Sequence, residues 1–387
     1  MLGQIPYGRQ DINADDIQAV IDVLHSEWLT QGPMVEKFEQ AVAEYCGANY
    51  AVAVNSATSA LHIACLAAGL GADDILWTSS NTFVASANCG LYCGAQVDFV
   101  DINSRTYNMS VAELEKKLIT AESKGKLPKV IIPVHFSGQS CEMRPIHELA
   151  KKYGCRVIED ASHAIGGSYQ GSKVGSCTYS DMTVFSFHPV KIVTTGEGGM
   201  VLTNNQDLYE KLIRLRSHGI TRNPKYMQGE SDGPWYYQQI ELGFNYRMTD
   251  MQAALGISQL QRIDEFICRR QMLAKVYNEK LAELPLVLPY QQPDTDSAWH
   301  LYVIKIKQHE GGKSRRQVYD ALRGYNIGVN VHYIPVHTQP YYQKMGFKQG
   351  DFPQTEHYYQ NVLTIPLYYG LTAQEQQYVI DCLNRCI

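Results

Sequence analysis

Short apolar runs alternate with amphipathic segments along the first two thirds of the chain. Several runs are nearly continuous, which is typical of strands buried on both faces of a mainly parallel sheet. The segments between them have helical spacing, so the pattern predicts α/β winding. Strands are expected over 50–54, 74–78, 96–100, 129–134, 156–159, 182–186 and 200–203, and helices over 35–46, 59–68 and 146–153.

An amphipathic helix is also predicted near the N-terminus. Asn13 is placed as its N-cap, and Ile17, Val20, Ile21 and Leu24 recur on one face.

The C-terminal third begins with a long helical stretch that Pro285 is expected to end. A chain of 387 residues exceeds one core of ordinary size, so more than one domain is predicted. The small C-terminal unit should contain strands over 301–306, 328–332 and 362–365 and helices over 314–323 and 373–384. The expected division is an N-terminal arm over 1–12, a large domain over 13–248, a connecting helix over 249–284 and a small α/β domain over 285–387.

Composition narrows the class of protein. Hydrophobic residues make up 45% of the chain and charged residues 19%, as in soluble globular proteins. The net charge of -5 argues against general binding to nucleic acid or to an anionic membrane, although it allows a local basic pocket. No signal segment, 20-residue apolar span, CxxC pair or zinc-ligand spacing is found, and most of the ten cysteines lie in apolar runs. We therefore expect a reduced, cytoplasmic protein without a metal site.

The segment NSATS, residues 55–59, lies between a predicted strand and a predicted helix. Small and hydroxylated residues there leave backbone N–H groups at the positive end of a helix, where a phosphate can bind. The same residue types are the commonest helix caps, so the segment alone predicts either role.

A carboxylate follows another predicted strand, in the string VIEDASH. Asp160 stands where open α/β sheets place their ligands, and a carboxylate facing a pyridine nitrogen keeps that nitrogen protonated. A solvated turn or a helix cap is the alternative role for Asp160.

A lysine follows the apolar strand of FSFHPVK and precedes the glycine-rich string TTGEGG. A desolvated lysine has a lowered pKa and can form a Schiff base, so Lys191 is a candidate for that chemistry. Ser186 could bind a phosphate or satisfy backbone groups at the strand end. A fourth string, GFNYRMTD, opens the long helix: Thr249 or Asp250 can cap it, which leaves Asn245 and Arg247 as candidate anion contacts.

Together these strings resemble the DegT/StrS family of sugar-nucleotide aminotransferases, a branch of the fold-type I pyridoxal-phosphate enzymes. NSATSALH, EDASHA, FSFHPVK and TTGEGG carry the likeness, which extends over essentially the whole chain. NSATSALH, DASHA, SFHPVK, RSHGI and VHYIP are most similar to the PseC type, which acts in pseudaminic acid biosynthesis. The resemblance implies a fold-type I aminotransferase, with a large mainly parallel-sheet domain and a smaller C-terminal α/β domain.

The resemblance also implies roles for individual residues. Lys191 would hold pyridoxal 5'-phosphate as a Schiff base and shuttle a proton, and Asp160 would pair with the pyridine nitrogen. His163, often glutamine in the family, would hydrogen-bond the ring hydroxyl or stack. Phe83 would stack on the ring, although a core aromatic is the plainer reading of that residue. The phosphate would be bound by Ser56, Ala57, Thr58, Ser186 and, across a homodimer, Asn245 of the partner subunit.

The implied reaction is a ping-pong transamination. Glutamate would give its amino group to form pyridoxamine phosphate, which would aminate a UDP-linked 4-keto-6-deoxy-N-acetylhexosamine at C4. His332 taken alone would more often be a satisfied structural histidine. The nucleotide-sugar pocket would be lined by Tyr7, Glu27, Trp28, Leu29, Thr30, Ser56, Ser186, Asn245, Arg247, Asn330, Val331, His332 and Tyr333.

Other classes stay open or are disfavoured. A dTDP-linked or a 3-keto sugar nucleotide is an alternative substrate. An amino-acid aminotransferase could hold a carboxylate with Arg323 or Arg385, and a non-catalytic relative is a further alternative. A nicotinamide-dependent oxidoreductase would need a G-x-G-x-x-G turn after an early strand, which residues 54–58 do not supply. Dehydratase relatives lack the Schiff-base lysine, whereas Lys191 is present here.

Overall fold

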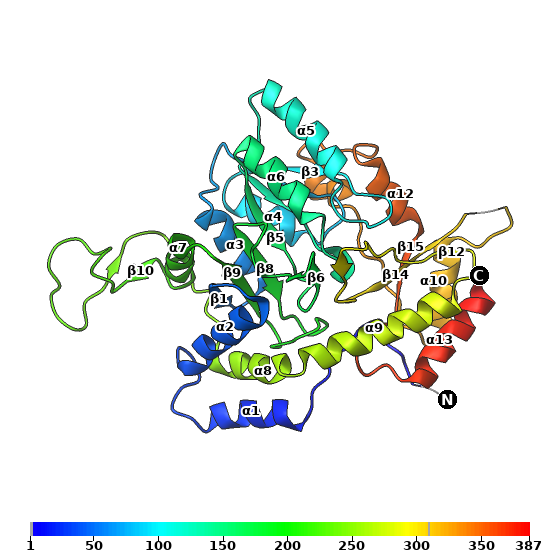
Figure 1. Cartoon of the computed structure of the whole chain (residues 1–387), viewed down its shortest axis with the longest axis horizontal. Helices are drawn as coiled ribbons and strands as arrows, with labels where there is room; N and C mark the ends of the chain where they lie inside the picture. Colours follow the sequence, from blue (N-terminus) through cyan, green and yellow to red (C-terminus); the bar gives the residue numbers. More distant parts are fainter. Residues whose placement is uncertain (1–2, 309) are drawn as a thin grey trace.

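The computed structural model describes residues 3–308 and 310–387. A seven-stranded sheet lies at its centre, in the order β1-β9-β8-β5-β4-β2-β3 (Figure 1). The run from β3 to β8 is parallel, and β9 pairs antiparallel with both neighbours. The predicted mainly parallel α/β sheet is therefore confirmed. Its strands are β1 (Tyr50–Val54), β2 (Ile75–Ser79), β3 (Gln96–Val100), β4 (Val130–Ile132), β5 (Arg156–Asp160), β8 (Met182–Ser186) and β9 (Gly199–Thr203).

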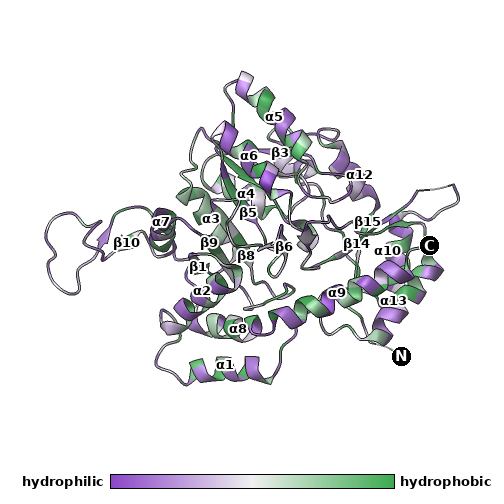
Figure 2. Ribbon diagram, viewed as in Figure 1, coloured by the Kyte–Doolittle hydropathy of each residue, from purple (hydrophilic) through white to green (hydrophobic). Residues whose placement is uncertain are grey.

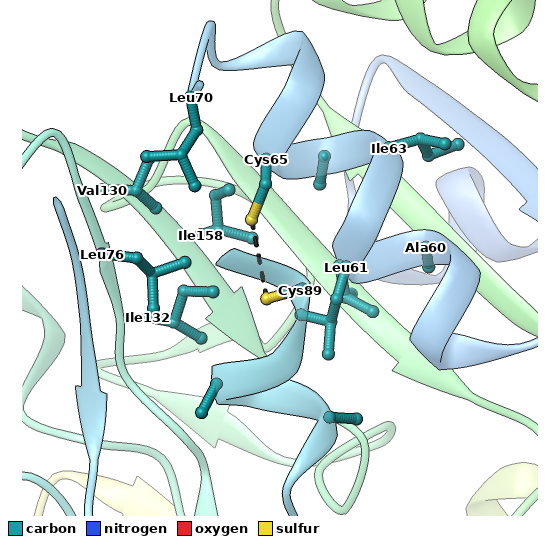
Figure 3. Packing of buried hydrophobic residues seen from close by; sticks show 14 of the residues in the cluster. Ala60, Leu61, Ile63, Cys65, Leu70, Leu76, Cys89, Val130, Ile132 and Ile158 are labelled. Carbon is teal, nitrogen blue, oxygen red and sulfur yellow. Dashed lines mark hydrogen bonds between the residues drawn. The ribbon is translucent and has the colours of Figure 1, made fainter. Parts of the chain in front are cut away.

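Helices cover both faces of this sheet, which explains the continuous apolar runs. Val52 and Val54 of β1 are buried in one core, and Ala51 and Ala53 are buried in another core on the opposite face. Figure 2 shows the hydrophobic residues gathered at the central strands, and Figure 3 shows one of the cores, in which Leu61 and Cys65 gather with Ile132 and Ile158. The helices around the sheet are α2 (Pro33–Cys46), α3 (Ala57–Ala67), α4 (Ala85–Tyr92), α5 (Val111–Ser123), α6 (Met143–Tyr153) and α7 (Gln206–Arg216).

A smaller antiparallel sheet, β12-β14-β15, forms the C-terminal part. The strand predicted over 328–332 is wrong: that segment makes only one isolated bridge, between Asn330 and Thr364, before the chain turns. The elements of this part are β12 (Leu286–Val287), β14 (Tyr302–Ile306), β15 (Val362–Ile365), α10 (Arg315–Gly324), α11 (Pro340–Gln343), α12 (Pro353–Asn361) and α13 (Ala373–Cys386). A third sheet joins β13 (Thr295–Asp296) to β6 (Ser168–Tyr169) and β7 (Ser172–Lys173).

The expected connecting helix is two helices, α8 (Asp250–Leu260) and α9 (Ile263–Lys280). Thr249 caps α8 through a capping box, as predicted, but the chain leaves helical geometry at Arg262. The Arg262 guanidinium forms ion pairs with Asp11 and Asp16, which hold the N-terminal segment against this break. The predicted uninterrupted helix, and its end at Pro285, are wrong, while the predicted domain boundaries stay a prediction.

Helix α1 (Ala14–Leu24) starts at the predicted cap, Asn13. Its apolar face is not buried, however, because Ile17 and Leu24 are each 54% exposed. The helix is anchored from its other side by Asp16, which accepts a hydrogen bond from Ser258 of α8. The apolar face of α1 is therefore left largely uncovered within one chain.

A hairpin arm projects from the sheet beyond α7 (Figure 1). Its strands are β10 (Ile220–Thr221) and β11 (Gln238–Gln239), and it carries Trp235 at 68% exposure. Leu242, just after it, is 77% exposed. No helix in the described ranges is long and apolar enough to cross a membrane.

Candidate active site

A cavity of about 530 Å³ lies at the carboxyl ends of the parallel strands, where open α/β sheets place their ligands. Tyr7 of the N-terminal segment and residues 330–333 add a further part of its wall. The N-terminal segment is held at the cavity because Leu367 N–H donates to the Tyr7 carbonyl and Ile5 pairs with Ile327. The cavity brings together most of the residues predicted for the site, namely Tyr7, Ser56, Ala57, Thr58, Phe83, Asp160, His163, Ser186, Lys191, Asn330, Val331, His332 and Tyr333.

Two predicted segments do not line this cavity. The segment 27–30 follows α1, with Trp28 53% exposed, and its end is bridged to the start of α8. Asn245 is exposed and pairs with Ser217, and Arg247 is partly exposed. The residues that lie apart from the cavity within one chain are Glu27, Trp28, Leu29, Thr30, Asn245 and Arg247.

The amino end of α3 forms one end of the cavity. Ser56 caps α3, since its hydroxyl oxygen accepts a hydrogen bond from the Ser59 N–H at 3.1 Å. Gly199 of β9 passes so close that a Cβ there would lie 2.5 Å from the Ser56 backbone. Ser186 pairs with Gly199 and therefore stands beside the same helix end. The first N–H groups of α3 and nearby hydroxyls provide an anion site.

Asp160 ends β5 and is only 5% exposed. Its Oδ1 accepts hydrogen bonds from the Ser162 N–H at 3.1 Å and from the Ser162 hydroxyl at 2.6 Å. Its Oδ2 accepts a hydrogen bond from the Ser86 hydroxyl, also at 2.6 Å. Donors to a carboxylate favour its charged form, so these contacts stabilise a buried negative charge.

Lys191 lies in the loop after β8 and points its amine at the same cavity. Burial lowers the pKa of Lys191 to about 8, and the negative charge of Asp160 acts in the opposite direction. Within residues 3–308 and 310–387, no hydrogen bond or ion pair engages its Nζ. A large share of this amine is thus neutral near pH 8 and can act as a nucleophile.

Three neutral imidazoles surround the lysine. His163 Nδ1 accepts a hydrogen bond from the Ser137 N–H at 3.2 Å, so its proton is on Nε2, which lies 3.1 Å from the Tyr333 hydroxyl. Burial and the charge of Lys191 lower the pKa of His163 well below its usual range. The His300 ring lies against His163 in a tilted arrangement, with ring centroids 4.5 Å apart, and burial lowers the pKa of His300 too.

His332 fits the structural role considered for it. Its Nδ1 lies 2.8 Å from the Thr364 hydroxyl and its Nε2 lies 3.4 Å from the Asn330 amide. Burial and the charge of Lys191 lower the pKa of His332 to about 3, so the ring is neutral near pH 7. His332 therefore offers no positive charge to a diphosphate.

Sequence reasoning missed several residues of the cavity wall. His188 and Glu197 belong to the strings FSFHPVK and TTGEGG that mark the lysine, so their position could have been noticed. Thr82 directly precedes the predicted Phe83 and could also have been noticed, whereas His300 carried no such signal because it lies far along the chain from the lysine loop. Ser86, which does not line the cavity but binds Asp160, was missed for the same reason.

A buried carboxylate, a partly neutral lysine and a helix amino end on one cavity have the chemistry that pyridoxal phosphate requires: a partner for the ring nitrogen, an amine for the aldehyde and donors for the phosphate. The residues present fit this cofactor. A fold with a mainly parallel sheet and this site defines a pyridoxal-phosphate-type aminotransferase.

The chain belongs to the DegT/DnrJ/EryC1/StrS aminotransferase family, whose model matches residues 10–384. It is 40% identical over 386 residues to the spore coat polysaccharide biosynthesis protein SpsC of Bacillus subtilis, covering 99% of this chain and 97% of the relative. It is 37% identical over 380 residues to the UDP-4-amino-4,6-dideoxy-N-acetyl-beta-L-altrosamine transaminase of Campylobacter jejuni, covering 98% and 96%.

Solved structures agree with this membership. The PseC aminotransferase of Helicobacter pylori, involved in the biosynthesis of pseudaminic acid, superposes with a TM-score of 0.90 at 29% identity over 99% of both chains. A Streptococcus pneumoniae protein solved in PMP and PLP forms superposes with TM-scores of 0.90 and 0.88 at 28% and 26% identity. The protein is therefore a sugar aminotransferase of a pyridoxal-phosphate-dependent family.

The two arginines considered for an amino-acid aminotransferase lie elsewhere. Arg323 is exposed on α10 and Arg385 is exposed on α13, and neither lines the cavity. A carboxylate-binding arginine at either position is therefore disfavoured.

Proposed function

We propose that the protein transfers an amino group from glutamate to C4 of a UDP-linked 4-keto-6-deoxy-N-acetylhexosamine, with Lys191 holding pyridoxal phosphate. The placement of Lys191 and Asp160 on one cavity, with the lysine pKa near 8, carries the cofactor assignment. The strings shared with the PseC type and the Campylobacter jejuni relative support the sugar. The similarity to SpsC keeps another nucleotide-linked keto sugar as the alternative.

Asp160 and Lys191 have separate roles in the proposed reaction. When bound, the cofactor supplies an aldehyde for the amino group and a ring that accepts the electron pair released at the substrate carbon. Asp160 keeps the ring nitrogen protonated, because its charge is fixed by hydroxyl donors. Lys191 Nζ takes the proton from the donor carbon and returns one to the sugar carbon, as its lowered pKa suits a base near neutral pH.

His163, Tyr333 and Phe83 on the cavity wall would position the ligands. His163 is neutral and donates to the Tyr333 hydroxyl, whose own proton is then available to an oxygen atom in the cavity. Burial and the charge of Asp160 raise the pKa of Tyr333, so it remains a donor. Phe83, 58% exposed in this chain, offers a ring face for stacking at the cavity wall.

The charge of the cavity supports a site shared by two subunits. Among the described residues, Lys191 is the only lysine or arginine that lines it, while Asp160 and Glu197 contribute two carboxylates. A cofactor phosphate and a sugar diphosphate need further cations and donors. These would come from Asn245 and Arg247 of the partner subunit.

The local structure of that loop favours this assignment. The rings of Phe244 and Tyr246 stack on each other, and both contact His62 of the same chain. Because side chains alternate along an extended segment, Asn245 and Arg247 are directed away from these anchors. The described part of the chain gives Arg247 no hydrogen bond or ion pair.

The exposed apolar surfaces support a homodimer. The face of α1, the segment 27–30 and the hairpin arm present apolar side chains that monomers seldom leave uncovered. A second copy of the chain would bury them and bring Asn245 to the neighbouring cavity.

A panel of keto sugar nucleotides tests the substrate. The purified enzyme, loaded with pyridoxal phosphate and supplied with glutamate, is offered UDP-linked N-acetylated 4-keto, dTDP-linked 4-keto and 3-keto sugars. We expect turnover of the UDP-linked 4-keto sugar, with NMR locating the new amine at C4. An amine at C3, or turnover of a dTDP-linked sugar alone, would contradict the proposed substrate.

A further inference from the structure

A chain of two hydroxyl groups joins the cavity wall to the buried carboxylate. The Thr82 hydroxyl, at the wall, lies 2.8 Å from the Ser86 hydroxyl, and the Ser86 hydroxyl lies 2.6 Å from Asp160 Oδ2. Ser86 is fully buried and Thr82 is 2% exposed. Water therefore cannot replace either partner without a rearrangement of the first turn of α4.

The direction of these hydrogen bonds follows from the chemistry of Asp160. An ionised carboxylate only accepts, so the single proton of the Ser86 hydroxyl is directed to Oδ2. Ser86 Oγ must then accept from Thr82, whose proton is directed into the chain. Each donor polarises the next, which strengthens the final bond to the carboxylate.

The remaining contacts show how closely Asp160 is held. Ser162 occupies Oδ1 with two donors, so Oδ1 and Oδ2 are both fixed from the protein side. Ser86 leaves the second acceptor direction of Oδ2 open. Rotation of the carboxylate would break the bond to Ser86 at 2.6 Å, so Ser86 fixes the direction in which that open site points.

We propose that Ser86 is a positioning residue that aims Asp160 Oδ2 at the cofactor's ring nitrogen and thereby sets how fully that nitrogen is protonated. This rests on the proposed role of Asp160. Without Ser86, the carboxylate is held by Ser162 at Oδ1 alone, so the direction of Oδ2 is less firmly fixed. The ring nitrogen then shares its proton with a less well-aligned acceptor, and the ring becomes a weaker electron sink.

Three variants of the holoenzyme test this proposal. Ser86→Ala removes the donor, and Ser86→Cys keeps a weak donor of similar shape. Thr78→Val is the matched control, because Thr78 is equally buried in β2 but donates to the Ile132 carbonyl instead of to Asp160. Each is loaded with cofactor labelled with nitrogen-15 in the ring, and the ring-nitrogen NMR signal is recorded alongside the rate of the half-reaction with glutamate.

We expect the wild type and Thr78→Val to show a protonated nitrogen. In Ser86→Ala the signal should move toward that of an unprotonated nitrogen and the half-reaction should slow about tenfold with KM for glutamate unchanged, as for loss of one hydrogen bond to a charged group. Ser86→Cys should lie between the two. A wild-type nitrogen signal in Ser86→Ala would overturn the proposal even if rate or stability fell, because the hydroxyl would then be structural only. An unprotonated nitrogen in the wild type would instead overturn the role of Asp160 itself, and the inference with it.

Discussion

The hydroxyl of Tyr333 lies 3.1 Å from Nε2 of His163, and this contact joins the C-terminal part of the chain to the loop after β5. His163 must donate in it, because its Nδ1 already accepts from the Ser137 N–H. The two side chains therefore form one wall of the cavity, with the phenol oxygen held by a neutral imidazole.

Tyr333→Phe should destabilise the apoprotein because it leaves the buried Nε2–H of His163 without a partner. The expected loss is about 1–3 kcal/mol in the free energy of unfolding by denaturant. Tyr341→Phe is the control, since Tyr341 is 60% exposed. Equal stability of the two variants would show that the contact contributes nothing.

Asp160→Ala should still bind pyridoxal phosphate, because the α3 end and Lys191 are unchanged. Its rate of transamination should fall on the order of a hundredfold or more, since the charge that holds the ring proton is lost. Single-turnover absorbance of the half-reaction with glutamate measures this. Kinetics close to wild type would mean that another group faces the ring nitrogen.

Lys191 should titrate well below an ordinary lysine. As pH rises through about 8 the amine loses its proton, so its reactivity toward an amine reagent should rise and then level off. The lysine of an added model peptide, with an ordinary pKa of about 10.4, should continue to gain reactivity past pH 10. Competitive labelling of the apoprotein, followed by peptide mass spectrometry, compares the two. The same dependence of reactivity on pH for both amines would contradict the buried environment assigned to Lys191.

Asn245 is expected to act across the dimer. Lys191→Ala and Asn245→Ala chains should each be impaired, but a mixed dimer contains one site with both residues intact. Random reassortment would then restore about a quarter of wild-type activity. No recovery after mixing, with subunit exchange verified by mass, would count against a shared site.

The elements buried within one chain could be predicted from the sequence. The strands over 96–100 and 182–186 have the bounds expected, and Asn13 and Thr249 cap helices as expected. Those signals are local, because propensity, burial and capping agree at each position. The strand over 328–332 failed because Val329 packs in the core and Val331 lines the cavity, while the segment pairs with β15 only through Asn330.

Features that depend on distant contacts could not be predicted. The break at Arg262 depends on Asp11 and Asp16, which lie some 250 residues earlier. The exposed face of α1 has the periodicity of a buried helix, and periodicity alone does not show whether a face is covered within the chain. Ser86 reaches Asp160 across 74 residues, with no motif around it.

The attachment of the cofactor to Lys191 can be tested directly by chemical reduction and mass spectrometry. The holoenzyme is reduced with borohydride, which makes the bond between cofactor and amine permanent, and the digested protein is mapped by mass spectrometry. We predict a single pyridoxyl group on the peptide that contains Lys191, and none in Lys191→Ala treated alike. A label on another lysine, or the same label in Lys191→Ala, would contradict the central claim.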